Sequence, residues 1–274
     1  MPRSYSLTRN NLLNFAMQTA REAGRILSDR LGRALQVSNK GAIDLVTEAD
    51  LASEQLIIDR IKSYYPRHAI LAEESGATEA GDGNDGTSEW KWIIDPLDGT
   101  TNYAHGYPCF CVSIALEHEN RIEIGVIYDP SRDEMFAAER GQGAHLNDRR
   151  MRVSDIEDLN SAMLCTGFPY NVRERPNFTR DFAKFTMESQ AVRRDGSAAL
   201  DLAYLACGRF DGFFEEGLKA WDVAAGVLLI EEAGGTVSDF EGQPLNIYTP
   251  KIYAPKVLAS NGLVHEAMIR VLRD

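Results

Sequence analysis

An apolar strand that runs straight into two carboxylates constrains this chain more than any other feature of its sequence. The stretch WKWIIDPLDGTT, residues 90–101, begins with an apolar run at residues 92–94 that is typical of a buried strand. Asp95 and Asp98 follow at once, and burying two like charges is costly unless a cation compensates them. The fold must therefore end a buried strand where positive charge can bind.

The residues around these two acids favour a phosphate site. Pro96 fixes φ and makes a rigid corner across which Asp95 and Asp98 can converge. Gly99 permits close backbone approach, and GTT opens a short helix whose free N–H groups and positive dipole end suit a phosphate. Carboxylates beside a phosphate-binding turn indicate metal-assisted phosphoryl chemistry. Mg²⁺ is the natural ion because histidine and thiolate are absent from the motif.

Three further acidic groups lie at the ends of expected elements, where ligand sites of layered α/β structures usually collect. They are Glu73-Glu74 after a strand, Asp222 at a helix start, and Asp44 and Asp50 in the motif DLVTEAD. Each also has a purely structural interpretation: a solvated turn, a helix N-cap, and a charge in the first turn of a helix. Taken singly, these groups do not establish a site.

Composition narrows the class of protein. The 274 residues, 44% of them hydrophobic, suffice for one large domain or two intimate halves, and the net charge of −12 argues against a nucleic-acid partner. The four cysteines form no C-x-x-C pair, and the five histidines show no zinc spacing. The chain has neither a secretory h-region nor an apolar run of transmembrane length. We therefore expect a soluble, reduced, cytoplasmic protein without a membrane partner.

Hydrophobic periodicity and turn residues predict an α+β fold. We expect a single domain over 1–274, with a soft internal boundary near 150 between an N-terminal α+β half and a C-terminal α/β half. Residues 39–50 are expected to form a loop or short turn. Helices are expected at 9–33, 49–64, 99–104, 177–189, 196–208, 221–235 and 262–274, and strands at 68–74, 90–95, 109–118, 121–130, 134–140, 162–168, 210–216 and 257–261.

Several motifs together resemble the inositol monophosphatase family of Mg²⁺-dependent, lithium-sensitive sugar phosphatases, and the bacterial members most closely. DPLDGTTNY and WDVAAGVLLIEEAGG are the main points of likeness, and AEESG, DLVTEAD and GSAALDLAYLACGRFDGFFE match in order and spacing over nearly the whole chain. The resemblance implies a layered αβαβα sandwich, commonly assembled as a homodimer. It also implies two to three Mg²⁺ per site and inhibition by Li⁺ at the second metal position.

The resemblance further implies which residues bind the metals. Glu73, Asp95 and the Leu97 carbonyl would hold the first ion. The second ion would lie among three acids, namely Asp95, Asp98 and Asp222. A third, weaker ion would contact Glu73 through water.

Roles around the substrate follow from the same resemblance. Asp50 would hydrogen-bond Thr100, and Thr100 with Glu74 would position and deprotonate the attacking water. The backbone at Gly99 and Thr100 would hold the phosphate. The polyol hydroxyls would face a group consisting of Asp98, Gly196, Ser197, Ala198 and Glu215. Lys40 and Asp44 lie in a segment that resembles a mobile loop closing over the site.

The expected reaction is hydrolysis of inositol 1-phosphate, or a similar polyol phosphate, by direct in-line attack of a metal-activated water. Fructose 1,6-bisphosphate and nucleotide 3′-phosphates are alternative substrates, because the metal and phosphate motifs contact only what all of these share. Glu215 favours a polyol and disfavours a second phosphate beside it. A different alternative is a regulatory protein with an unidentified protein partner that retains the fold. The completeness of the acidic set argues against a purely non-catalytic role.

Overall fold

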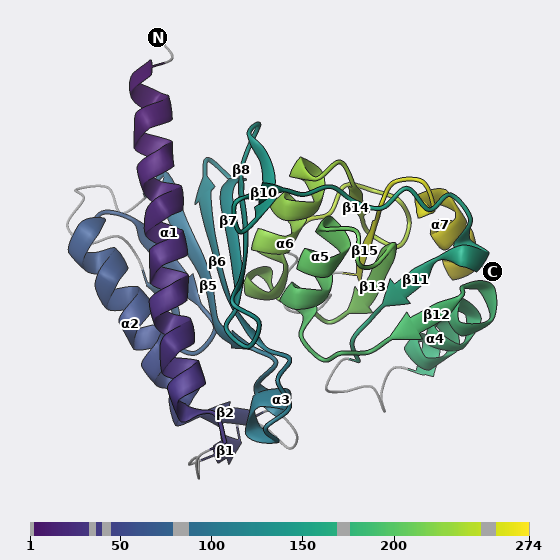
Figure 1. Ribbon diagram of the computed structural model, residues 1–274, viewed down its shortest axis with the longest axis horizontal. Coiled ribbons are helices and arrows are strands. Elements are labelled where there is room, and N and C mark those ends of the chain that lie inside the picture. The colour runs from purple at the N-terminus through teal and green to yellow at the C-terminus, as the bar shows by residue number, and fades with distance from the viewer. Residues whose placement is uncertain are drawn as a thin grey trace.

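The computed structural model describes residues 3–32, 37–39, 45–78, 88–168, 176–247 and 256–273 (Figure 1). Lys40 and Asp44, the two residues expected in a mobile loop, lie outside these ranges. The helices within them are α1 (Arg3–Arg30), α2 (Glu48–Tyr64), α3 (Thr100–Ala104), α4 (Pro176–Glu188), α5 (Ala198–Ala206), α6 (Ala220–Glu232) and α7 (His265–Arg273), with a 3₁₀ turn, η1, at Leu159–Ser161.

The strands form a two-stranded, an eight-stranded and a five-stranded sheet. The small sheet consists of β1 (Val37–Asn39) and β2 (Leu45–Thr47). The large sheet has the order β10-β9-β8-β7-β6-β5-β3-β4, built from β3 (Ala69–Ala72), β4 (Gly76–Thr78), β5 (Trp90–Asp98), β6 (Cys111–His118), β7 (Arg121–Asp129), β8 (Glu134–Glu139), β9 (Gly143–Leu146) and β10 (Arg149–Arg150). The third has the order β12-β11-β13-β15-β14, built from β11 (Met163–Cys165), β12 (Ala191–Arg193), β13 (Gly212–Glu216), β14 (Thr236–Ser238) and β15 (Lys256–Ser260).

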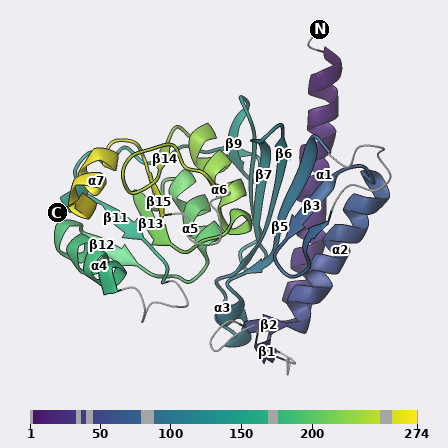
Figure 2. The same cartoon turned by 180° about the vertical axis from the view of Figure 1, so that it is seen from behind.

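Helices and sheets alternate in layers, which confirms the predicted αβαβα sandwich (Figures 1 and 2). Successive side chains of a strand point to opposite faces, so neighbouring residues of β5 enter different layers. Trp92 and Ile94 belong to the core beneath α1 and α2, whereas Ile93 belongs to the core shared with α5 and α6. On β13, Phe213 faces α5 and α6, and Phe214 faces the outer layer of α4 and α7.

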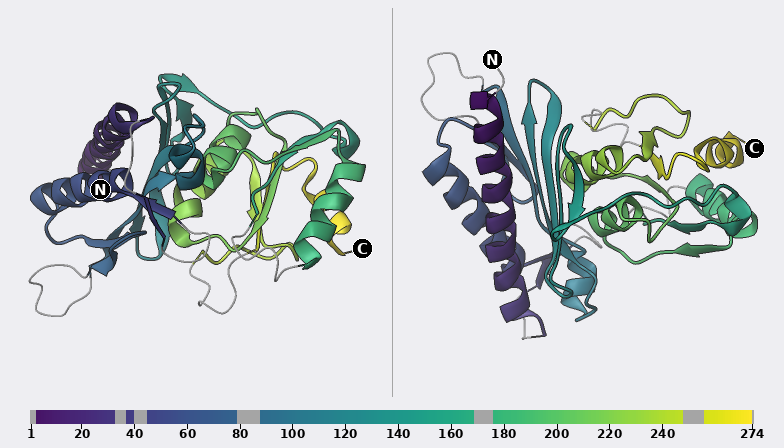
Figure 3. Two further views of the ribbon diagram at one scale, coloured as in Figure 1. Left: turned by 90° about the horizontal axis from the view of Figure 1, so that it is seen from below. Right: turned by 45° about the horizontal axis from the view of Figure 1, so that its top comes forward.

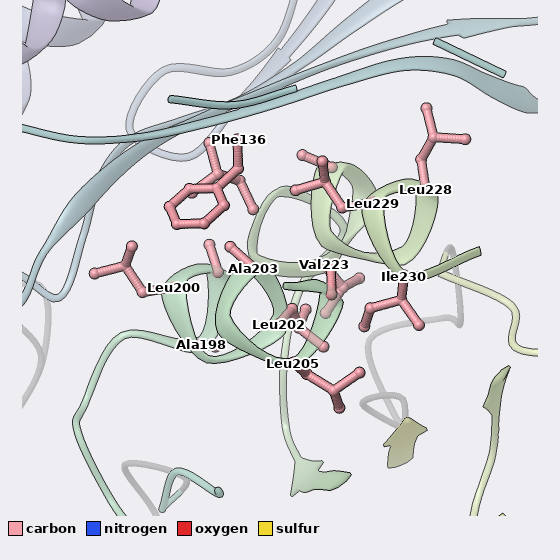
Figure 4. Close-up of a cluster of buried hydrophobic side chains, with 14 of the residues drawn as sticks. Phe136, Ala198, Leu200, Leu202, Ala203, Leu205, Val223, Leu228, Leu229 and Ile230 are labelled. Carbon is pink, nitrogen blue, oxygen red and sulfur yellow. The ribbon is translucent and has the colours of Figure 1, made fainter. Parts of the chain in front are cut away.

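The middle layer, α5 and α6, connects the two large sheets (Figure 3). Figure 4 shows its leucines and valine with Phe136 of the eight-stranded sheet above them. The same buried cluster includes Phe213 and Ala259 from the five-stranded sheet. Since one continuous core contains residues from both sides of position 150, the start of each middle helix is held at a fixed place between the sheets.

The predicted helices are all present, and their ends differ from prediction by a few residues. One prediction is wrong: the segment 39–50, expected to be a loop or turn, contributes to an antiparallel pair in which Asn39 pairs with Leu45 and Val37 with Thr47. The short strands β4, β9, β10, β12 and β14 were also not predicted. Strands of two to four residues carry too little alternation to be recognised, and they are stabilised by their neighbours more than by their own composition. No helix in the described ranges is long and apolar enough to cross a membrane.

Candidate active site

A parallel strand pair brings the first two acids together. Strand β3 runs parallel to β5 with Ala72 paired to Ile94, and the Glu73 N–H continues the ladder by donating to the Ile94 carbonyl at 3.2 Å. The next positions along the two strands are Glu73 and Asp95, so their side chains lie at the same edge of the sheet. Asp95 is only 2% exposed. Burial raises the pKa of Asp95 well above its ordinary value, and the charge of Glu73 raises it further.

A β-bulge turns the third acid to the same side. Asp95 pairs with Ser113 and Asp98 with Cys111, so β5 has one residue more than β6 between these pairs. In a regular strand, residues three apart point to opposite faces. The extra residue changes this phase, and both acids line one cavity. Pro96 lies inside the bulge, where its missing N–H costs no ladder bond.

Helix α5 binds Asp98 from the opposite wall. The Ser197 hydroxyl donates to Asp98 Oδ2 at 2.6 Å, and the Ala199 N–H donates to the same oxygen at 2.7 Å. Burial raises the pKa of Asp98, while these hydrogen bonds act in the opposite direction. The Ser197 side chain therefore hydrogen-bonds Asp98 and makes no capping hydrogen bond to its own helix, α5.

The fourth acid, Asp222, lies in the first turn of α6. Its Oδ2 accepts the N–H of Lys219, the N-cap residue, at 2.6 Å. Burial raises the pKa of Asp222 well above its ordinary value, and the charges of Asp98 and Glu73 raise it further. The structural alternative, an N-cap role for Asp222, is wrong in its position: Lys219 is the N-cap and Asp222 is the N3 residue that accepts its N–H, while Asp222 also lines the same cavity as Asp95 and Asp98.

These acids share one cavity of about 290 Å³. Its lining also includes the remaining predicted backbone and polyol positions, which are Leu97, Gly99, Thr100, Gly196, Ser197, Ala198 and Glu215. Asp50 and Glu74, also predicted to belong to the site, are not among the residues that line the cavity. Within the described ranges, no group of three or more His, Cys, Asp or Glu side chains is arranged so that it could hold a metal ion. The case for a cation therefore depends on the chemistry of the donors.

Asp50 lies behind Thr100 and contacts it. Thr100 Oγ1 is 3.1 Å from Asp50 Oδ1 and 3.0 Å from the Leu97 carbonyl. A hydroxyl has one hydrogen to donate, so either contact leaves its lone pairs available toward the cavity. The other Asp50 oxygen accepts the Thr47 N–H at 2.9 Å. Burial raises the pKa of Asp50, and the hydrogen bonds from Thr47 and Thr100 lower it.

Gly99 occupies a position that no other residue fits. Its φ of +93° is in the left-handed region, and an added Cβ would lie 2.8 Å from the Cys109 carbonyl oxygen. It is the N-cap of α3, a helix of only five residues. So short a helix has a small dipole, which weakens the dipole argument made from the sequence. What the turn at Gly99 and Thr100 offers an anion is its backbone N–H groups.

The part of the cavity lining around Glu215, the far wall, differs from the four acids in its hydrogen bonding. Glu215 is 6% exposed, and a Cβ added at Gly167 would overlap its carboxylate. Burial raises the pKa of Glu215 well above its ordinary value, whereas the charge of the Arg194 guanidinium lowers it. The guanidinium carbon of Arg194 lies 5.6 Å from the ring centre of Phe168. Glu215 Oε2 has no hydrogen-bond partner within the described part of the chain. An acceptor of this kind suits a hydroxyl donor on a ligand.

Three residues close to the site were missed by the sequence reasoning. Asn102 Nδ2 donates to the carbonyls of Asp195 and Cys109, each at 2.8 Å, which joins α3 to the loop before α5. Ser53 and Glu54, both in α2, hydrogen-bond backbone groups next to the site: the Ser53 hydroxyl donates to a carbonyl after β5, and the Glu54 carboxylate accepts two N–H groups of the turn after β3. A signal was available for the latter pair, because they are polar residues in helical phase with the apolar face of α2.

The overall fold of the chain matches that of solved structures. The structure resembles the extragenic suppressor protein SuhB from Bartonella henselae with a TM-score of 0.89 and 42% identity, covering 96% of this chain and 99% of that chain. It resembles the inositol monophosphatase from Anabaena (Nostoc) sp. PCC 7120 with a TM-score of 0.84 and 44% identity, covering 97% and 96%. These likenesses place the fold in the class of layered sandwiches of the sugar phosphatase type.

Sequence comparison then gives the family. The model of the inositol monophosphatase family matches residues 8–274. The chain is 46% identical over 266 residues to the Nus factor SuhB of Escherichia coli (strain K12), covering 96% of each chain. It is 45% identical over 270 residues to the inositol-1-monophosphatase of Mesorhizobium japonicum, covering 97% and 98%. The chain belongs to the inositol monophosphatase family.

Proposed function

We propose that the protein is a Mg²⁺-dependent phosphomonoesterase that hydrolyses inositol 1-phosphate, or a similar polyol phosphate, to the polyol and phosphate. The observation that supports this best is the convergence of Glu73, Asp95, Asp98 and Asp222 on one cavity beside the turn at Gly99. Family membership and the likeness to an inositol-1-monophosphatase support a phosphatase. The specific reaction and its residue roles are our inference.

The donors of the cavity fit Mg²⁺. They are carboxylates and the Leu97 carbonyl, and hard divalent cations prefer oxygen ligands. Buried carboxylates whose pKa values are raised by one another also require positive charge to ionise together. Glu73, Asp95 and Leu97 would hold one ion, and Asp98 and Asp222 with Asp95 a second; a third would contact Glu73 through water. Bound Mg²⁺ would lower the pKa of a coordinated water and neutralise charge on the phosphate.

The remaining steps belong to the chain itself. Thr100, held by Asp50, would orient the attacking water through the lone pairs of its hydroxyl. Glu74, in the turn next to Glu73, is the residue that the family resemblance assigns to take the proton from this water, although it does not line the cavity. The backbone N–H groups at Gly99 and Thr100 would hold the phosphate in line. No covalent intermediate is needed, because phosphoryl transfer depends mostly on positioning and electrostatics.

The choice of substrate is assigned to the far wall. The unpartnered oxygen of Glu215 would accept a hydrogen bond from a polyol hydroxyl, and Asp98, Gly196, Ser197 and Ala198 would complete this face. A second phosphate beside Glu215 would be repelled, which disfavours fructose 1,6-bisphosphate and nucleotide bisphosphates as alternatives. The relative from Mesorhizobium japonicum, named inositol-1-monophosphatase, supports the same choice.

Phosphate release from a substrate panel tests the proposal. The panel contains inositol 1-phosphate, fructose 1,6-bisphosphate, a nucleotide 3′,5′-bisphosphate and glycerol 2-phosphate, each with and without Mg²⁺. We expect a preference for inositol 1-phosphate and a loss of about 10³-fold in kcat/KM in Asp95→Asn, because this change removes a charge shared by both ions. Mg²⁺-dependent release with another preference would change the substrate and keep the mechanism. Release that does not need Mg²⁺ would contradict the mechanism.

A regulatory role is the second candidate, and the names of several relatives favour it. Proteins 45–49% identical to this chain are called Nus factor SuhB. An unidentified protein partner from the transcription machinery is therefore a proposal for this chain as well. Asp95→Asn separates the two roles: a cellular function that survives with no phosphatase activity would support the regulatory one.

The remaining expectations from the resemblance belong to the same proposal. They are a homodimer, inhibition by Li⁺ and a cytoplasmic location. Light scattering of the purified protein measures the first, and phosphate release at rising Li⁺ concentration measures the second. A fusion to a fluorescent protein in cells measures the third.

A further inference from the structure

One edge of α2 is polar although it is buried. Asp50 and Ser53 are 0% exposed and Glu54 is 4% exposed, and the apolar residues Ile57 and Ile61 continue the same face. Residues three and four apart share one side of a helix, so the three polar side chains form a single edge. Buried polar groups are nearly always hydrogen-bonded, and the partners of this edge show what it does.

Two of these side chains hold the corner that follows β5. The Ser53 hydroxyl donates to the Pro96 carbonyl at 2.8 Å, across 43 residues of sequence. Asp50 contacts the Thr100 hydroxyl at 3.1 Å. The β-bulge around Pro96 is therefore fixed against α2 on one side, while its two acids face the cavity on the other.

Glu54 holds the neighbouring turn. Its Oε2 accepts the Glu74 N–H at 2.9 Å, and its Oε1 accepts the Ser75 N–H at 2.9 Å. Two hydrogen bonds from consecutive N–H groups to one carboxylate are charge-assisted and fix orientation as well as distance. Residues 73–75 form the turn between β3 and β4, whose last pair is Ala72 with Gly76. The carboxylate of Glu54 thus holds the second and third residues of the turn, while the first, Glu73, is held at its N–H by the Ile94 carbonyl.

The two parts of the site that α2 holds would otherwise repel each other. Glu73 and Asp95 are the next positions after the parallel pair Ala72 and Ile94, so their side chains lie at the same end of the sheet, and two ionised carboxylates there favour moving apart. Glu54 and Ser53 do not line the cavity, so neither touches a substrate. Both bind backbone atoms, and both come from adjacent positions of one rigid helix.

We propose that Glu54, assisted by Ser53, is a positioning residue that holds the Glu73–Ser75 turn against the Pro96 corner and so sets the affinity of the site for Mg²⁺. The identity of the ion rests on the proposed function. In this arrangement α2 acts as a common support for two segments that supply ligands to the same ion. Loosening that support lets the ligands separate, which weakens ion binding and leaves the substrate-facing wall unchanged.

The test is Glu54→Gln, measured by Mg²⁺ titration calorimetry without substrate. The amide keeps one acceptor but turns an NH₂ group toward a backbone N–H, so one charge-assisted hydrogen bond is lost and two donors face each other. We expect the Kd for Mg²⁺ and the Mg²⁺ half-saturation of phosphate release to rise about tenfold or more, and KM at saturating Mg²⁺ to stay within about twofold. Amide exchange at Glu74 and Ser75 should become faster.

Glu48→Gln is the matched control, because it makes the same chemical change on an exposed position of the same helix. Its Kd for Mg²⁺ should equal that of the wild type. A folded Glu54→Gln variant with the wild-type Kd would overturn the proposal. If Glu54→Gln does not fold, Glu54→Asp and Ser53→Ala replace it: each keeps the helix intact and should raise the Kd by a smaller factor, and wild-type values in both would equally overturn the proposal.

This experiment separates the positioning role from the proposed function. A wild-type protein that binds Mg²⁺ but releases no phosphate from the panel would refute the phosphatase proposal. The role of Glu54 would then still be judged from the calorimetric Kd. Conversely, a wild-type protein that releases phosphate, with a Glu54→Gln Kd unchanged, would refute only the positioning role.

Discussion

The two ends of the cavity differ in how completely their polar groups are bonded. The four-acid end is formed by Glu73, Asp95, Asp98 and Asp222. Hydrogen bonds from the chain hold three of these acids: Asp95 accepts the Leu97 N–H, Asp98 accepts two hydrogen bonds, and Asp222 accepts the Lys219 N–H. At the Glu215 end, an oxygen of Glu215 has no partner within the described residues. Both oxygens of Asp201, a 1% exposed residue of α5 that does not line the cavity, also have no partner within the described residues.

This difference separates two tasks. An end lined by four carboxylates suits a divalent cation, because hard cations prefer oxygen ligands and carboxylates brought together need positive charge to ionise. An end with unbonded acceptors suits a ligand that brings its own donors, since such a site rejects analogues that lack them. Under the proposed function, the four-acid end would carry the chemistry and the Glu215 end would carry the choice of substrate. Three further changes test this division.

Gly99→Ala should have the largest effect, because it breaks the four-acid end. Ala at a φ of +93° is strained, and its Cβ would meet the Cys109 carbonyl at 2.8 Å. We expect a loss of about 2–4 kcal/mol in the free energy of unfolding. Urea denaturation measures it. Gly234→Ala is the matched control, since Gly234 has a φ of +91° with no atom within 4 Å. An equal loss in both variants would show that φ alone matters.

Glu215→Gln should have an intermediate effect, confined to the other end. The amide cannot accept the same hydrogen bonds as the carboxylate, so KM for inositol 1-phosphate should rise about tenfold. Release from glycerol 2-phosphate, which offers fewer hydroxyls, should change less, and the Kd for Mg²⁺ should not change. Steady-state kinetics on both substrates decide the matter. A uniform fall in kcat on every substrate would contradict the division between the ends.

The smallest effect is a dependence of stability on pH when divalent cations are removed with EDTA. The folded pKa values of Asp95 and Asp222 lie well above the ordinary value of 3.8. The folded state therefore binds these protons more tightly than the unfolded state. This contribution to stability is fully present below pH 3.8 and is lost as the pH rises through the folded pKa.

We therefore expect Tm in EDTA to fall by a few degrees as the pH rises from about 4.5 to 8. Mg²⁺ should reduce that fall, because the ion replaces the protons. Asp95→Asn in EDTA should reduce it as well, since one of the raised groups is gone. A thermal melt at each pH measures this, and an identical pH dependence with and without Mg²⁺ would show that the four-acid end binds no such ion.

Much of the site could be anticipated from sequence because its acids lie next to strong local signals. Asp95 and Asp98 flank a proline directly after an apolar strand, and Asp222 opens an apolar helix. The structure brings these groups to the lining of one cavity. The sequence does not show what brings them there, because neither the parallel register that aligns Glu73 with Asp95 nor the bulge between Asp95 and Asp98 is visible in it.

What escaped prediction depends on contacts between distant segments. Glu54 holds backbone N–H groups 20 and 21 residues away, and a backbone group has no signature in the sequence of its partner. The pairs formed by β1, β12 and β14 involve only three residues each. Such short strands are stabilised by their neighbours and not by their own composition.

The middle helix layer has a consequence for the order in which the site is completed. Asp98 is bound by an N–H from α5, 101 residues further along the chain, and Asp222 lies at the start of α6. A chain emerging from the ribosome can form the eight-stranded sheet with α1 and α2 before those helices exist. Its acids would then be present without their opposite wall. Contacts of such sequence separation form slowly. We therefore expect the cavity to be completed only when α5 and α6 pack against the eight-stranded sheet.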